Sequence, residues 1–80
     1  MVPAEPDEYV VRGPVGFGAA VKEFRFRREM SQQQLAELAD VHRTSLSALE
    51  TGTTTEALKR LMQVLAALDL EVVVREKGRS

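Results

Sequence analysis

One segment, Ser31–Gly52, constrains the fold of this chain more than any other, because it predicts two short helices joined by a tight turn. It opens with a serine that Gln34 follows three residues later, the spacing of a capping box at the start of a helix. We expect helices at 32–38 and 43–50. Asp40 lies in the turn between them and tolerates a positive φ better than most residues.

Apolar residues recur within both helices at a spacing of three, which places them on one face of each helix. Together with an apolar residue in the turn, these positions are Leu35, Leu38, Val41, Leu46 and Leu49. The pattern predicts that each helix buries one stripe in the core. The outer face of the second helix carries short hydrogen-bonding side chains and is narrow enough to enter a groove.

These residues resemble the helix-turn-helix of the phage-repressor-like family, the Cro/CI-type or xenobiotic-response-element regulators. The pattern SQxxLAxxAxVxRxxLSxLExG carries the resemblance, which extends over about residues 17–74. The leucine-rich end at 53–74 resembles HipB-type antitoxins. The resemblance implies an all-α fold: a compact domain of four to five helices, with a short C-terminal β-strand used for dimerisation.

Eighty residues make one small domain with a modest core. The net charge is −1, yet the acidic first eleven residues leave the rest of the chain weakly basic. Weak charge predicts modest non-specific DNA affinity, because that affinity comes from neutralising phosphates. We expect an acidic flexible lead at 1–12, a helix-turn-helix domain at 13–69, a dimerisation strand at 70–76 and a tail at 77–80.

The residue inventory argues against an enzyme, a metal site or a cofactor. The chain has no cysteine and a single histidine, and its carboxylates are scattered. The Gly-Phe-Gly at 16–18 lacks a following Gly-Lys-Ser/Thr, so we interpret it as a loop entering a helix. No apolar run is as long as the roughly 18 residues of a membrane span, and no signal peptide is apparent. A cytoplasmic location is expected.

A first helix is expected at 17–29, with Phe17, Val21 and Phe24 on one face. Its basic cluster is open to two interpretations, a nucleic-acid contact or a solvated helix face; the members are Lys22, Arg25, Arg27 and Arg28. In the family that the chain resembles, an arginine at the position of Arg25 pairs with the glutamate that ends the recognition helix. That glutamate is Glu50 here, so we expect a structural Arg25–Glu50 ion pair.

The C-terminal third predicts a helix and a strand. Thr53 and Glu56 have capping-box spacing, and a helix at about 55–68 carries an apolar stripe that we expect in the core: Leu58, Leu61, Met62, Leu65 and Leu68. A β-prone run follows: Glu71, Val72, Val73, Val74 and Arg75. The run Tyr9–Val11 is either a strand or a stray extended segment. The helices offer no other partner, so we expect the C-terminal strand to pair with its copy in a second chain.

Three acidic residues stand where the family commonly has glycine: Glu29, Asp40 and Asp69. Aspartate accepts a left-handed conformation at some cost, whereas glutamate does so less readily. His42 replaces the usual Ser or Thr cap of the recognition helix. We interpret His42 as a weak cap or a neighbour of phosphate rather than a pH switch.

A helix-turn-helix places the N-terminal residues of its second helix against base edges in the major groove. The candidate base contacts are Arg43, Thr44, Ser47 and Ala48. Arginine can grip guanine O6 and N7 with two donors. The candidate phosphate contacts are Gln32, His42, Thr51, Thr53 and Thr54. For the threonines and serines, ordinary capping and loop solvation are the competing interpretation.

The sequence therefore predicts a dimeric, sequence-specific repressor of a palindromic DNA operator. The resemblance to HipB-type antitoxins further implies a protein that represses its own operon and binds a HipA-like serine/threonine kinase toxin. Two alternatives remain open at this point: a free-standing regulator without a toxin, and a module that acts mainly through protein contacts.

Overall fold

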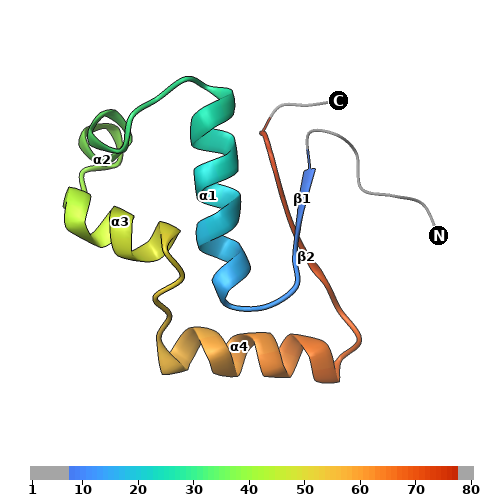
Figure 1. Cartoon of the computed structure of the whole chain (residues 1–80). Helices are drawn as coiled ribbons and strands as arrows, with labels where there is room; N and C mark the ends of the chain where they lie inside the picture. The colour runs from blue at the N-terminus through green and yellow to red at the C-terminus, as the bar shows by residue number, and fades with distance from the viewer. Residues whose placement is uncertain (1–7, 78–80) are drawn as a thin grey trace.

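The computed structural model describes residues 8–77. Figure 1 shows α1 standing between the α2–α3 pair and a small sheet, with α4 lying across the end at which α1 begins. Within the described residues the fold is mostly helical, which agrees with the predicted class. In chain order the elements are β1 (Glu8–Val11), α1 (Val15–Arg27), α2 (Gln32–Ala39), α3 (Arg43–Glu50), α4 (Glu56–Ala67) and β2 (Val72–Arg75).

Side-chain caps fix where α2 and α4 begin. The Oγ of Ser31 accepts from the Gln34 backbone N–H at 3.0 Å, and the Gln34 side chain accepts from the Ser31 N–H at 2.8 Å, so the predicted capping box is present. At α4 the prediction was wrong, because Thr55 rather than Thr53 caps the helix by accepting from the Leu58 N–H at 3.2 Å. The preceding threonines belong to the connection from α3.

Residues in the left-handed conformation close three of the helices. Glu29, Asp40 and Asp69 have φ values of 55°, 57° and 59°. After each of them the next N–H bonds to a carbonyl five residues back: Met30 to Arg25, Val41 to Ala36 and Leu70 to Leu65, at 2.9 to 3.1 Å. This is the Schellman closure of a helix C-terminus. The three acidic residues therefore occupy the conformation that their glycine-like positions predict.

The first helix begins at Val15, two residues earlier than expected, and takes in the glycines that we interpreted as a loop. Gly18 is buried where α1 crosses α3, and a Cβ at this position would overlap the carbonyl oxygen of Leu49. Glycine here lets the two helix backbones approach closely. The approach sets the position of the C-terminal end of α3 on α1.

The sheet corrects the expected partner of the C-terminal strand. β1 is a true strand and pairs antiparallel with β2 of the same chain, with Tyr9 opposite Val74 and Val11 opposite Val72. The chain turns after Val11 and enters α1 directly, so β1 lies along that helix (Figure 1). One edge of β1 therefore remains available for pairing with β2. One edge of the C-terminal strand is thus hydrogen-bonded to β1 of the same chain, and no second chain is needed for this pairing.

The core is small, and two predictions about it were wrong. The buried apolar residues are Val11, Ala20, Ala36 and Leu46, and among residues 8–77 no large side chain is fully buried. Leu38 is 76% exposed, because the buried side of α2 is formed by Ala36 instead.

No residue of α4 is buried, although its stripe was expected in the core. Its half-buried residues Leu58, Met62 and Leu65 recur at i, i+4 and i+7, and so mark the side that faces the rest of the chain. Leu61 and Leu68 lie on a neighbouring side and are exposed. The apolar arc of this helix is wider than the surface that its own chain covers. None of the described helices has the length and hydrophobicity needed to cross a membrane.

Candidate nucleic-acid interface

The predicted base contacts lie in the first half of α3 as two pairs one turn apart. Arg43 and Thr44 are exposed in the opening turn, and Ser47 and Ala48 follow at i+4 with half-buried side chains. His42 occupies the N-cap position, but its side chain makes no capping hydrogen bond. The exposed residues of this helix are therefore the three of its opening turn, Arg43, Thr44 and Ser45.

A buried ion pair holds the other end of α3 against α1. The Arg25 Nε and Nη2 donate to the two carboxylate oxygens of Glu50 at 2.8 and 2.9 Å. The Arg25 Nη1 also donates to the backbone carbonyl of Met30 at 2.8 Å. The side chains are 8% and 1% exposed. The expected Arg25–Glu50 pair is thus formed, and it ties α1, the turn after it and the recognition helix together.

Gln32 joins this cluster from the start of α2. Its Nε2 donates to the Glu50 Oε1 at 3.1 Å, so the amide that we assigned to phosphate also has a structural partner. An amide carries a second N–H, and the first backbone N–H groups of a helix are directed outward from its start. The prediction of a phosphate contact at Gln32 therefore rests on these remaining donors.

The cluster keeps Glu50 ionised. The hydrogen bonds from Arg25 lower the pKa of Glu50 below its ordinary value, burial opposes this, and the bond from Gln32 adds to the lowering. The same hydrogen bonds raise the pKa of Arg25. Both partners are consequently charged at neutral pH.

The threonines after α3 differ from one another. The Thr51 hydroxyl donates toward the backbone carbonyls of Ser47 and Ala48, at 3.1 and 3.0 Å, so its single hydrogen is used at the end of the helix. This places it in the capping role that competed with a phosphate contact. Thr53 is exposed and Thr54 is half-buried in the connection to α4, where both remain predicted phosphate neighbours.

Two arginines of the basic cluster on α1 have acidic neighbours. Arg27 lies 3.7 Å from Glu23 one turn earlier, and Arg28 lies 3.7 Å from Glu76 after β2. Exposed pairs at this distance contribute little to stability. They do satisfy the charge of both arginines at the surface, which favours the solvated-face interpretation for this pair. No cluster of metal-binding side chains occurs within residues 8–77.

Sequence reasoning missed two features of this region. Gly18 was dismissed with its loop, although a glycine inside a helical pattern is itself a sign of close packing. Phe26 was not considered, yet its ring is exposed and lies within cation–π range of two cations, Lys22 and Arg25.

Comparison with known families agrees with this geometry. The profile of a family described as Helix-turn-helix domain matches residues 17–74, which is more than half of the chain. The chain belongs to this helix-turn-helix family. The match runs from α1 to β2, so it includes the helix and the strand that follow the recognition helix. No curated protein and no solved structure matches the chain.

Proposed function

We propose that this helix-turn-helix protein is a sequence-specific transcriptional repressor that reads the DNA major groove with the first half of α3. The observation that carries the proposal is the division of α3 into two ends. Arg43 and Thr44 are exposed at its start, whereas Leu46 and Glu50 are held against the rest of the domain. Such a helix can enter the groove without losing its support. This role places the protein with the DNA, in the cytoplasm.

Equilibrium binding tests this role. A labelled duplex from upstream of the protein's own gene is titrated with the protein and followed by fluorescence anisotropy, with a scrambled duplex of the same composition as control. A specific repressor binds its site on the order of 10³-fold or more tightly than unrelated DNA. Equal affinity for the two duplexes across several salt concentrations would argue against sequence-specific reading at this promoter.

The proposed active form is a two-fold homodimer. Exposed apolar side chains lie along one side of α4, at Leu61, Val64 and Leu68, and two more, Leu70 and Val73, follow in the chain. Exposed apolar side chains grouped in this way lower the solubility of a monomer. A self-complementary contact between two copies would bury these side chains on both chains. Two recognition helices about 34 Å apart would then read a palindromic operator.

A narrower form of the proposal is that the repressor is the antitoxin of a HipBA-like module and binds a HipA-like kinase toxin. Support comes from the resemblance of residues 53–74 to HipB-type antitoxins. Co-expression with the product of the neighbouring gene, followed by co-purification, tests it. A folded neighbour that does not co-purify leaves a free-standing regulator. Retained toxin binding in a variant that has lost operator binding would favour a mainly protein-interacting module.

A further inference from the structure

Lys22 differs from the other three members of the basic cluster, Arg25, Arg27 and Arg28. Arg25, Arg27 and Arg28 each have a carboxylate partner, in Glu50, Glu23 and Glu76. Among residues 8–77, Lys22 takes part in no ion pair. Its ammonium lies instead 5.9 Å from the centroid of the Phe26 ring, within cation–π range. Lys22 is therefore the cation of this cluster with charge to spare for a partner outside the chain.

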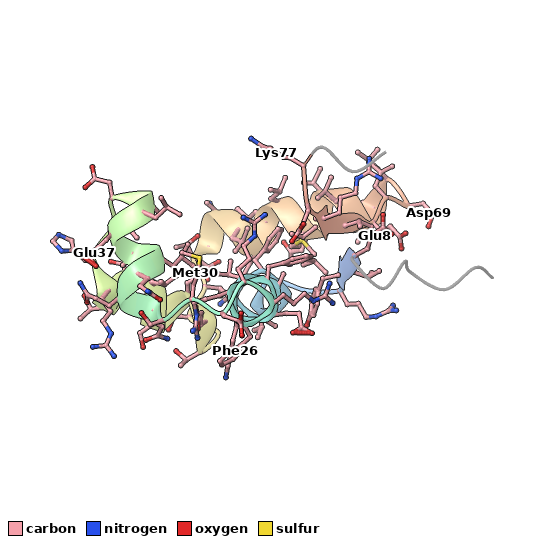
Figure 2. The ribbon with its side chains drawn as sticks, turned by 90° about the horizontal axis from the view of Figure 1, so that it is seen from above. Glu8, Phe26, Met30, Glu37, Asp69 and Lys77 are labelled. Atoms are coloured by element: carbon pink, nitrogen blue, oxygen red, sulfur yellow. The ribbon has the colours of Figure 1, made fainter. Side chains whose placement is uncertain are left out.

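Phe26 gives this charge a defined position. The ring is 57% exposed, and the Arg25 guanidinium lies 4.6 Å from the ring centroid. Because Arg25 is fixed by Glu50, the ring that it contacts is held as well, and Lys22 meets the same ring. Figure 2 shows Phe26 on the side of α1 that faces away from α4. An exposed aromatic ring with a cation over it is thus attached to the structural ion pair.

The surface lies beside the start of α2. Gln32, the first residue of α2, donates to the carboxylate that Arg25 holds. Lys22 also acts on that carboxylate through space and is one of the charges that lower the pKa of Glu50. Lys22 and Gln32 are therefore connected by contacts that pass through Phe26, Arg25 and Glu50. The start of α2 is where the first backbone N–H groups favour an anion.

We propose that Lys22, held over Phe26, contacts a DNA phosphate next to the phosphate that we predict at the start of α2. The inference rests on the proposed DNA-binding function and extends its footprint from the recognition helix onto α1. Arg25 is neutralised by Glu50, so Lys22 supplies the positive charge on this side of the domain. A phosphate contact of this kind fixes the register of the protein on the duplex and carries no sequence information.

The salt dependence of DNA binding tests the proposal. The slope of log K against log salt changes by about 0.9 for each phosphate that a protein neutralises. Lys22→Gln should therefore make the slope shallower by about one, and should weaken the upstream and scrambled duplexes by the same factor. Lys22→Arg should retain the slope. Lys59→Gln is the matched control, because this substitution removes the same charge from an exposed lysine on α4. The Lys59 ammonium lies 3.5 Å from a carboxylate oxygen of Glu56.

Each other outcome overturns the inference in a recognisable way. A Lys22→Gln slope equal to that of the wild type and of Lys59→Gln means that Lys22 contacts no phosphate. Unequal weakening of the two duplexes means that Lys22 acts on base reading through Glu50. A wild-type protein that binds neither duplex at low salt overturns the proposed function and this inference together. Far-ultraviolet circular dichroism and the melting temperature show that each variant is folded.

Discussion

Glu29 is the residue whose side chain conflicts most with its backbone. Its φ is 55°, and a glutamate has no short polar group with which to compensate the left-handed conformation, unlike Asp40 and Asp69. Removing the Cβ should relieve strain of about 1 kcal/mol. Glu29→Gly is therefore expected to raise the melting temperature by roughly 4–8 °C in a domain of this size.

The control for this prediction is a glutamate inside a helix. Glu37 is exposed in α2 and has a helical backbone, so Glu37→Gly should destabilise by about 1 kcal/mol. Thermal unfolding of the two variants should give shifts of opposite sign. Shifts of the same sign would mean that the Glu29 conformation carries no strain.

The lowered pKa of Glu50 predicts how the stability of the fold depends on pH. Its pKa is lowered in the folded state by Arg25, from an ordinary value of 4.5. The ion pair therefore contributes fully above that value, and its contribution is lost as the pH falls through the lowered folded pKa. Glu50→Gln should be markedly less stable than the wild type at pH 7, and the difference should shrink in acid. Melting curves between pH 7 and 2 check this, and a difference that stays constant contradicts it.

Arg43 carries the prediction for base reading. Arg43→Ala should weaken operator binding by roughly 1–3 kcal/mol and relax the preference at one base pair, because a bidentate contact to guanine is lost. Arg60→Ala on α4 removes an equivalent exposed charge away from α3 and should leave that preference intact. If Arg43→Ala keeps the wild-type ratio of operator to scrambled affinity, another residue reads the site.

At the scale of elements, the close crossing of α1 and α3 makes the sharpest prediction. Helix propensity alone would have Gly18→Ala stabilise α1 by about 1 kcal/mol. The new methyl would overlap the Leu49 carbonyl, so we expect the opposite, a loss on the order of 1–3 kcal/mol. Gly13→Ala, where nothing lies within 4 Å of the added atom, should be close to neutral. Denaturant unfolding decides, and a stabilised Gly18→Ala would contradict the described crossing.

The outer side of α4 predicts the oligomeric state. Val64 is exposed in the centre of the apolar side formed with Leu61 and Leu68, so Val64→Glu should give a monomer with much weaker operator binding. Gln63→Glu adds the same charge at an exposed position on a different side of the helix and should remain dimeric. Sedimentation velocity measures both. A dimer that survives Val64→Glu moves the contact to another surface, such as the open edge of the sheet.

The elements that the sequence predicts well are those with local signals. The Ser31 cap, the Asp40 turn and the bounds of α3 depend on residues a few positions apart, so they could be inferred before any tertiary contact was known. The burial of Leu38 and of the α4 stripe could not, because periodicity shows that a face is apolar without showing what covers it. The pairing of β1 with β2 depends on contacts across most of the chain.

The same division applies to the candidate site. The Arg25–Glu50 pair was predictable from the family resemblance, and Arg43 from its place at the start of the second helix. The donation from Gln32 to Glu50, the use of the Thr51 hydroxyl within α3 and the contact of Lys22 with Phe26 depend on side-chain directions. Spacing along the chain does not determine those directions.

At the scale of the whole molecule, the small domain serves to hold and present one surface, the first turn of α3, which we propose contacts DNA. The α1–α3 crossing and the Arg25–Glu50 pair hold the recognition helix from behind, and its first turn is left exposed. α4 lies across the end at which α1 begins and away from the first turn of α3 (Figure 1), so the proposed contact of a second copy with α4 leaves that turn exposed. This arrangement is compatible with the two-fold protein with two reading helices that we propose.

Selection of binding sites from a pool of random duplexes tests that account most directly. Protein-bound duplexes are recovered, amplified and sequenced over several rounds. We predict an enriched palindrome whose half-sites are centred about 10 base pairs apart, or a multiple of that distance, with one position in each half-site that becomes degenerate in Arg43→Ala. A pool that remains random after selection, with folded protein and at low salt, would contradict the claim that this protein reads DNA sequence.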